Sequence, residues 1–287
     1  MKKTKVFVLG ASGMLGNAVF RLFSNSDGFA ATGIIRSSRS LELLPPSLRK
    51  SVISNVDLES ADNLLRLFEK HQPNVIINCV GLIKQHADAN DPLVVLPINS
   101  LLPHRLAMLS SVTNARLVHI STDCVFSGAK GMYLESDFSD ARDLYGRSKF
   151  LGEVDYPNAI TLRTSIIGHE LDGTQSLVNW FLSQKDSIKG FTRAIFSGLP
   201  TVEIARVIRD YVIPNAHLSG LYHVSADPIS KYDLLKIIAD VYKKTISIEP
   251  DESFIIDRSL DSSRFRKATG FKPRPWLDLV NSMRDFG

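Results

Sequence analysis

A tyrosine and a lysine stand four positions apart in the segment YGRSK, as Tyr145 and Lys149. Residues at this spacing share one face of a helix. A free phenol has a pKa of about 10 and exchanges protons poorly at neutral pH. A neighbouring ammonium stabilises the phenolate and lowers that pKa. The pair therefore predicts a general acid, Tyr145, supported by Lys149, although a chance pair on a helix surface has the same spacing.

A hydroxyl group precedes this pair, where the apolar run at 116–122 leads into STDCVFSG. If the run is a strand, Thr122 stands at its carboxyl end. Its hydroxyl can then donate a hydrogen bond to a substrate carbonyl oxygen on which negative charge develops. Asp123 follows at once, and we expect it beside the substrate. Thr122, Tyr145 and Lys149 together predict chemistry at a carbonyl group.

A glycine-rich turn, GASGMLG, follows the first apolar run and places glycines at 10, 13 and 16. Gly10 would allow a tight turn, Gly13 would let phosphate oxygens approach backbone N–H groups, and Gly16 would let a helix pack closely on the strand. The positive end of that helix would bind a pyrophosphate. The spacing differs from G-x-G-x-x-G, and a turn without a ligand is the alternative. Its place after the first strand favours a dinucleotide site.

The second apolar run ends in GIIRSSRS, where an NAD-binding protein often carries an acidic residue. Here Arg36 and Arg39 flank two serines, and cations and hydroxyls suit a 2′-phosphate. NADPH is therefore preferred, with NADH left open, and a solvated loop with incidental arginines is the alternative. Asp57 would accept a hydrogen bond from the adenine amino group. Asn78, Val80 and Gly81 end the fourth run, where the ribose and phosphates should pass.

Short apolar runs alternate with amphipathic segments through the first half of the chain. We expect strands at 6–10, 31–36, 52–58, 75–82, 116–122 and 159–167, and helices at 13–23, 60–71, 97–112 and 144–154. Continuous apolar strands separated by helices indicate an α/β fold with a doubly wound parallel sheet. Later, we expect helices at 175–184, 202–213, 231–243 and 274–286, and a strand at 221–225. The prediction is an NADP-binding Rossmann domain over 1–167 and a smaller α/β substrate lobe over 168–287, with crossing of the chain between them left open.

The composition is that of a soluble globular protein, with 44% hydrophobic and 22% charged residues among 287. The net charge of +4 is scattered, which disfavours a nucleic-acid partner. Cys79 and Cys124 lie in apolar runs, so reduced thiols are expected, and no cluster of ligands suggests a metal. No signal peptide and no apolar run of membrane length are apparent. We expect a cytoplasmic protein without a membrane partner.

Five segments resemble the extended short-chain dehydrogenase/reductases, and among them the dTDP-4-dehydrorhamnose reductase branch. They are GASGMLG at 10–16, STDCVFSG at 121–128, YGRSK at 145–149, LRTS at 162–165 and GLYHVSA at 220–226. STD-x-VF-x-G combined with YGRSK-x-x-GE is the more specific part. The resemblance implies that Thr122, Tyr145 and Lys149 are catalytic. It implies cofactor contacts at Gly10, Ser12, Gly13, Met14, Leu15, Arg36, Arg39, Asp57, Leu58, Val80, Gly81 and Lys149, and substrate contacts at Thr122, Asp123, Tyr145 and Arg163.

The resemblance also suggests supporting roles. Asn99 is a candidate for such a role. For Arg163, which follows the sixth run, a structural ion pair is the alternative. His119 and His169 are expected to pack or form hydrogen bonds rather than bind ligands.

The activity that the resemblance implies is NADPH-dependent reduction of the C4 keto group of a nucleotide-activated 4-keto-6-deoxyhexose, in the synthesis of polysaccharide or O-antigen sugars. Related 4,6-dehydratases carry a second carboxyl where this chain has Cys124, so dehydration is disfavoured. The segments IIGHE at 166–170 and FSGLPTVEIA at 196–205 depart from the branch. They leave a UDP-linked 2-acetamido-4-keto-6-deoxyhexose open as the substrate. An NAD-dependent epimerase and a non-catalytic regulatory subunit with this fold also stay open, and so does a homodimer.

Overall fold

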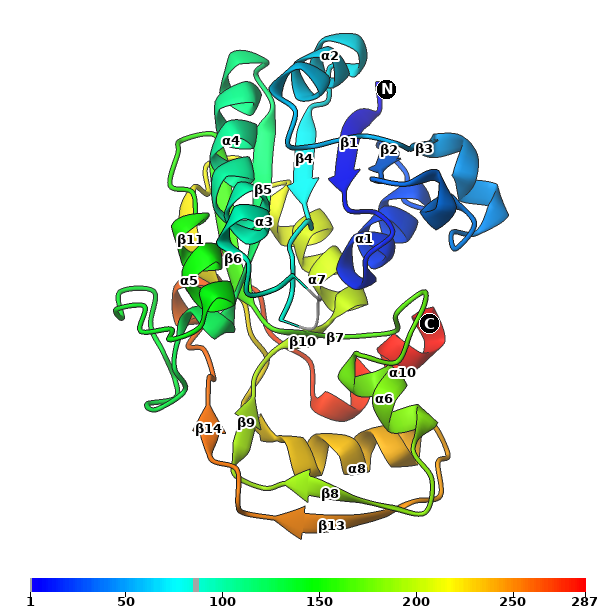
Figure 1. Cartoon of the computed structure of the whole chain (residues 1–287), viewed down its shortest axis with the longest axis vertical. Coiled ribbons are helices and arrows are strands. Elements are labelled where there is room, and N and C mark those ends of the chain that lie inside the picture. The colour runs from blue at the N-terminus through cyan, green and yellow to red at the C-terminus, as the bar shows by residue number, and fades with distance from the viewer. Residues whose placement is uncertain (1, 85–87) are drawn as a thin grey trace.

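A seven-stranded parallel sheet forms the centre of the molecule in the computed structural model, which describes residues 2–84 and 88–287 (Figure 1). The strand order is β11-β6-β5-β4-β1-β2-β3. The strands are β1 (Thr4–Leu9), β2 (Phe29–Ile34), β3 (Val52–Ile53), β4 (Val75–Asn78), β5 (Arg116–Thr122), β6 (Ala159–Thr164) and β11 (Gly220–His223). The order reverses between β1 and β4, and doubly wound sheets bind ligands beyond such a switch point. The predicted fold class is confirmed.

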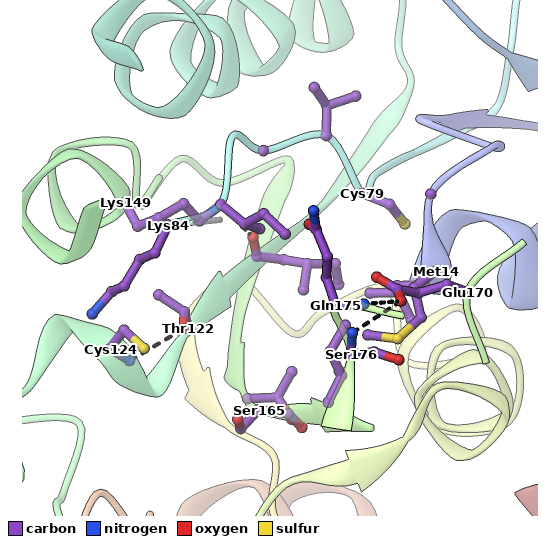
Figure 2. Close-up of a pocket in the computed structure, with 18 of the residues that line it drawn as sticks. Met14, Cys79, Lys84, Thr122, Cys124, Lys149, Ser165, Glu170, Gln175 and Ser176 are labelled. Carbon is purple, nitrogen blue, oxygen red and sulfur yellow. Dashed lines mark hydrogen bonds between the residues drawn. The ribbon is translucent and has the colours of Figure 1, made fainter. Parts of the chain in front are cut away.

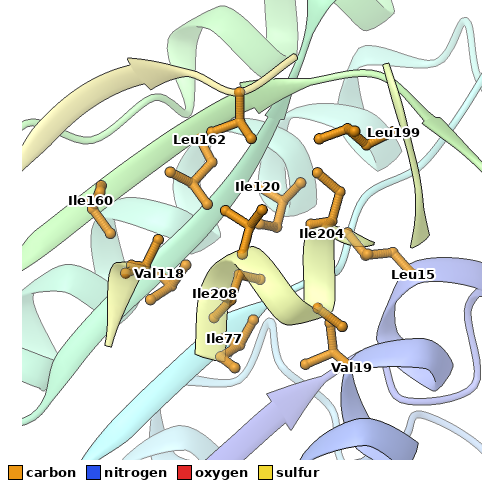
Figure 3. Packing of buried hydrophobic residues seen from close by; sticks show 14 of the residues in the cluster. Leu15, Val19, Ile77, Val118, Ile120, Ile160, Leu162, Leu199, Ile204 and Ile208 are labelled. Carbon is orange, nitrogen blue, oxygen red and sulfur yellow. The ribbon is translucent and has the colours of Figure 1, made fainter. Parts of the chain in front are cut away.

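Alternating side chains of the strands bury themselves on both faces of this sheet. On β1, Val6 and Val8 belong to one core cluster, whereas Phe7 and Leu9 belong to another. Helices α1 (Met14–Ser24) and α7 (Thr201–Val207), with the π-helical turn η5 (Ile208–Val212), cover the first face (Figure 3). Helices α2 (Ala61–His71) and α4 (Leu102–Val112) cover the second. Burial on both faces explains why the strands read as continuous apolar runs.

The helical run before β5 is longer than the sequence patterns predicted. Helix α3 (Pro92–Leu96), the π-helical turn η3 (Pro97–Leu101) and α4 follow one another without a break. This run of 21 residues is long and apolar enough to cross a membrane by length and composition, so the expectation that no apolar segment approaches that length is wrong. Leu102 and Leu106 are fully buried against the sheet. Core packing therefore accounts for these two residues, whereas Leu93, Met108 and Val112 of the same run are exposed.

The rest of the second half builds a smaller lobe below the carboxyl edge of the sheet (Figure 1). Its strands are β7 (Ile166–Ile167), β8 (Ser187–Phe191), β9 (Ala194–Phe196), β10 (Leu199–Pro200), β12 (Ile229–Ser230), β13 (Ser247–Asp251) and β14 (Ile256–Asp257). Its helices are α6 (Leu177–Ser183), α8 (Lys231–Val241) and α10 (Trp276–Phe286), whereas α9 (Ser263–Thr269) packs on β11 of the central sheet. The chain crosses between lobe and sheet, because α7 packs on α1 and β11 pairs with β6.

Several predicted elements are shorter in the structure. The strand expected at 52–58 pairs only over Val52–Ile53. Asn55 adopts a left-handed conformation with φ 58°, which ends extended pairing there. The strand expected at 159–167 is divided into β6 and β7, and the helix expected at 144–154 is α5 (Leu144–Leu151). Three 3₁₀ turns, η1 (Ser38–Leu41), η2 (Pro46–Ser51) and η4 (Asp123–Val125), complete the first half.

Candidate active site

A cavity of about 560 Å³ opens at the carboxyl edge of the sheet (Figure 2). Its walls come from the glycine turn after β1, the ends of β4 and β5, helix α5, the residues after β6 and the loop at 170–177. Among the residues predicted from the sequence, it is lined by Ser12, Gly13, Met14, Leu15, Val80, Gly81, Thr122, Asp123, Tyr145 and Lys149. The predicted cofactor turn and the predicted catalytic groups therefore share one cavity.

The glycine turn has the geometry that close phosphate approach requires. Gly10 lies in the left-handed region at φ 77°, which favours glycine. A Cβ atom at Gly16 would collide with the carbonyl oxygen of Gly10, so α1 packs directly on the turn. Gly13 precedes α1, and no side chain caps the helix there. The first N–H groups of α1 are therefore available to an anion at the cavity wall.

Thr122 ends β5 and its side chain organises the residues that follow. Its Oγ1 accepts a hydrogen bond from the Cys124 N–H at 3.1 Å and donates to Asp123 Oδ1 at 3.2 Å. Burial raises the pKa of the Asp123 carboxyl, and the positive charge of Arg258 opposes this effect. Gly146 allows α5 to approach, because a Cβ atom there would collide with the carbonyl oxygen of Cys124. This close approach brings Tyr145 beside Thr122.

Tyr145 and Lys149 both reach the cavity from α5, which begins after Asp143. Burial raises the pKa of the Tyr145 phenol, and its hydrogen bond with Thr122 acts in the opposite direction. Lys149 is 4% exposed, and its ammonium donates to the Ile120 carbonyl oxygen at 2.7 Å. Burial lowers the pKa of Lys149 to about 8, opposed by the charge of Glu153. The sequence predicts that Lys149 lowers the pKa of Tyr145, whereas in the structure burial is the larger influence and raises that pKa.

Arg163 does not line the cavity, and its contact with substrate stays a prediction. Its guanidinium binds the Glu153 carboxylate at two points, Nε to Oε1 at 2.7 Å and Nη2 to Oε2 at 2.6 Å. The third nitrogen, Nη1, lies 3.3 Å from His223 Nε2. The side chain is 2% exposed. Its hydrogen-bonding capacity is used within the core, which makes Arg163 part of a structural ion pair.

The residues predicted to hold the adenosine end lie beyond the cavity lining. Arg36 and Arg39 are exposed after the carboxyl end of β2. The Asp57 carboxylate is exposed and accepts a hydrogen bond from the Glu59 N–H at 2.9 Å. Leu58 packs beside the second core cluster. These residues follow β2 and β3 at the same edge of the sheet as the cavity, and their contacts with a cofactor stay predictions.

Other residues of the site did not stand out in the sequence. Glu170 shapes the cavity wall, because its Oε2 accepts hydrogen bonds from the N–H groups of Gln175 and Ser176, both at 2.9 Å (Figure 2). Lys84, in the loop after β4, also lines the cavity. The sequence signal that indicates Lys84 as a cavity residue is its position, as a charged residue, after a strand of the parallel sheet.

Asn99, expected in a supporting role, is fully buried and joins the loop after β4 to α5. Its Oδ1 accepts from the Leu82 N–H at 2.9 Å, and its Nδ2 donates to Ser148 Oγ at 3.1 Å. His119 is buried with Nδ1 3.1 Å from Asn78 Nδ2, and His169 bonds to the Tyr242 hydroxyl at 2.7 Å. Within residues 2–84 and 88–287, no group of three or more histidine, cysteine or acidic side chains could hold a metal ion.

Comparisons with known proteins agree with this geometry. Residues 4–285 match the family model described as RmlD substrate binding domain. Methionine adenosyltransferase 2 subunit beta of Danio rerio is 28% identical over 83% of this chain and 74% of its own length. The dTDP-4-dehydrorhamnose reductase of Aggregatibacter actinomycetemcomitans is 22% identical over 98% of this chain and 99% of its own length. The crystal structure of dTDP-4-dehydrorhamnose reductase from Bacillus anthracis str. Ames in complex with NADP covers 99% of both chains with a TM-score of 0.80 and 20% identity.

Proposed function

The chain belongs to the RmlD substrate binding domain family, and from this we propose that it is an NADPH-dependent reductase of a keto group on a nucleotide-linked sugar. One observation carries the proposal: Thr122, Tyr145 and Lys149 line the same cavity as the glycine turn. The reductase named among its relatives, and the NADP held by a protein of the same fold, support this assignment.

The residues at the turn fit a dinucleotide. The uncapped start of α1 offers N–H groups to a pyrophosphate. Gly81 lies in the cavity wall beside Lys149, where a Cβ atom would be 3.9 Å from Lys149 Nζ, an ordinary contact distance. Arg36 and Arg39 would hold the 2′-phosphate of NADPH. When bound, the cofactor supplies a hydride for the carbonyl carbon of the sugar.

The side chains around Tyr145 suit proton donation to the carbonyl oxygen. Because burial raises the pKa of Tyr145, the phenol carries its proton at neutral pH. In reduction, Thr122 and Tyr145 hydrogen-bond the sugar oxygen, and the proton passes from Tyr145 Oη to that oxygen. Lys149 lies one helical turn after Tyr145 on α5, and its ammonium is fixed by a hydrogen bond to the Ile120 carbonyl oxygen of β5. It supplies positive charge near the phenolate that the transfer leaves behind.

The finer proposal is reduction at C4 of a dTDP-linked 4-keto-6-deoxyhexose, as the relative named dTDP-4-dehydrorhamnose reductase suggests. Cys124 lines the cavity directly after Asp123 and supplies no second carboxylate for eliminating water. Ile166 and Glu170 in the cavity wall belong to the segment that differs in sequence from that reductase branch, so a UDP-linked 2-acetamido sugar is the alternative substrate.

A panel of dTDP- and UDP-linked 4-keto-6-deoxy sugars tests the proposal by the loss of NADPH absorbance, followed by identification of the product. Tyr145→Phe should reduce turnover by about 10²–10⁴-fold. Tyr156→Phe is the matched control, because this tyrosine is 37% exposed and bonds to His104 on the surface. Full turnover by Tyr145→Phe would rule out the proton-donor role. NAD that stays bound through purification, with no net consumption of NADPH, would indicate an epimerase instead.

A non-catalytic regulatory subunit is the second candidate, because a relative at 28% identity is named methionine adenosyltransferase 2 subunit beta. The complete set of Thr122, Tyr145 and Lys149 in one cavity argues for catalysis. Co-purification with a partner enzyme, together with no NADPH oxidation on any sugar of the panel, would favour the regulatory function.

A further inference from the structure

A second lysine approaches Tyr145 from a different element of the fold than Lys149 does. Lys84 lies in the loop after β4 and lines the cavity with Thr122 (Figure 2). Tyr145 lines the same cavity. Its ammonium is 5.7 Å from the centre of the Tyr145 ring. A cation at this distance over an aromatic face is attracted by the negative potential of the ring.

The same ammonium is tied to the start of α5. Lys84 Nζ lies 2.7 Å from Asp143 Oδ2. The other oxygen of that carboxylate, Oδ1, accepts a hydrogen bond from the Gly146 N–H at 2.8 Å and so caps the helix. Asp143 is two residues before Tyr145, so the ion pair joins the β4 loop to the turn of α5 that carries the phenol.

We propose that Lys84 is a positioning residue for Tyr145. Lys84 holds the first turn of α5 through Asp143 and stabilises the phenolate that proton transfer produces on Tyr145. The inference rests on the proposed function, because it assigns Tyr145 as the proton donor. Lys149 lines the same cavity from α5, with its ammonium fixed on the Ile120 carbonyl.

The charges that face Tyr145 define the direction of the effect. The charged groups come from the β4 loop, from η4, from α5 and from the lobe: Lys84, Asp123, Asp143, Lys149 and Arg258. The Cys124 thiol also faces Tyr145, and burial raises its pKa to about 11, so it is uncharged at neutral pH. The Asp143 charge raises the pKa of Tyr145. Lys84 neutralises Asp143 and adds its own positive charge over the ring. Loss of Lys84 therefore disfavours the phenolate for two reasons, and the pKa of Tyr145 should rise.

Lys84→Met tests the proposal, and Lys130→Met is a matched control. Lys130 also lies 5.7 Å from the centre of a tyrosine ring, that of Tyr133, and also pairs with an aspartate, Asp137, at 2.5 Å. This second set does not line the cavity. We expect Lys84→Met to shift the alkaline limb of the kcat profile upward by about half a pH unit. At neutral pH, kcat should fall roughly threefold, and Lys84→Arg should restore most of it. Lys130→Met should leave both unchanged.

A readout without turnover separates this inference from the proposed function. A fluorinated tyrosine at position 145 ionises at lower pH, and its phenolate can be titrated by absorbance in the folded protein with and without Lys84. A rise in its pKa in Lys84→Met supports the positioning role even if no sugar of the panel is reduced. An unchanged pKa overturns the role. A higher KM for NADPH with unchanged kcat and unchanged pH profile also overturns it and assigns Lys84 to cofactor binding.

Discussion

Replacing Arg163 by methionine tests whether this arginine serves the core or the substrate. The change removes the cation but keeps much of the side-chain volume. It leaves the Glu153 carboxylate, whose side chain is 9% exposed, without its two-point partner. Breaking a buried pair in this way costs about 3–5 kcal/mol, because an uncompensated charge stays buried. For a chain of this length, that cost lowers the melting temperature by about 5–8 °C.

Thermal unfolding followed by circular dichroism at neutral pH measures this loss, and steady-state kinetics on the same samples measure KM for the sugar. Arg209→Met is the control, because the Arg209 and Asp210 side chains are 28% and 44% exposed and their ion pair should contribute less than about 1 kcal/mol. A double variant that also changes Glu153 to leucine should recover more than half of the lost stability, since neither charge of the Arg163–Glu153 pair then stays buried. A wild-type melting temperature combined with a KM more than tenfold higher would show that Arg163 contacts the substrate, and would refute the assignment.

Three further predictions follow from the cofactor turn and the buried network. Gly16→Ala forces a methyl group against the Gly10 carbonyl oxygen. It should lower the free energy of unfolding by about 1–3 kcal/mol and weaken NADPH binding, measured by fluorescence titration. An unchanged Kd for NADPH would contradict the close packing of α1 on the turn. Burial and the charge of Arg163 lower the pKa of His223 to about 4. Because the unfolded histidine takes up its proton near pH 6.5, the free energy of unfolding should fall by up to about 3 kcal/mol as the pH drops from about 6.5 to 4. The variant His223→Gln should reduce this pH dependence, measured by urea-induced unfolding. Changing Arg36 and Arg39 together to alanine should lower kcat/KM for NADPH by about 10–100-fold and leave the NADH value unchanged; equal losses with both cofactors would exclude 2′-phosphate recognition.

The first half of the sheet was predictable because its signals are local. The run at 116–122 is buried on both faces, and its length of seven residues favours a strand over a helix. The glycines at 10, 13 and 16 report a turn whose backbone requires them. The lobe was harder to predict. Its strands have two to five residues, as in β12 and β8, and they alternate burial too briefly for a period to emerge.

By itself, the sequence determined the doubly wound sheet, the glycine turn and the place of Tyr145 and Lys149 on one helix, because backbone conformation and helical spacing depend on neighbouring residues. Only the tertiary structure decided the partners of the charged side chains. Arg163 binds Glu153 and meets His223 of β11, 60 residues away, and Lys84 meets Asp143, 59 residues away. Such contacts depend on which strands lie next to one another and on how far each side chain is buried. The same arginine therefore serves the core, whereas a lysine in an irregular loop lines the cavity.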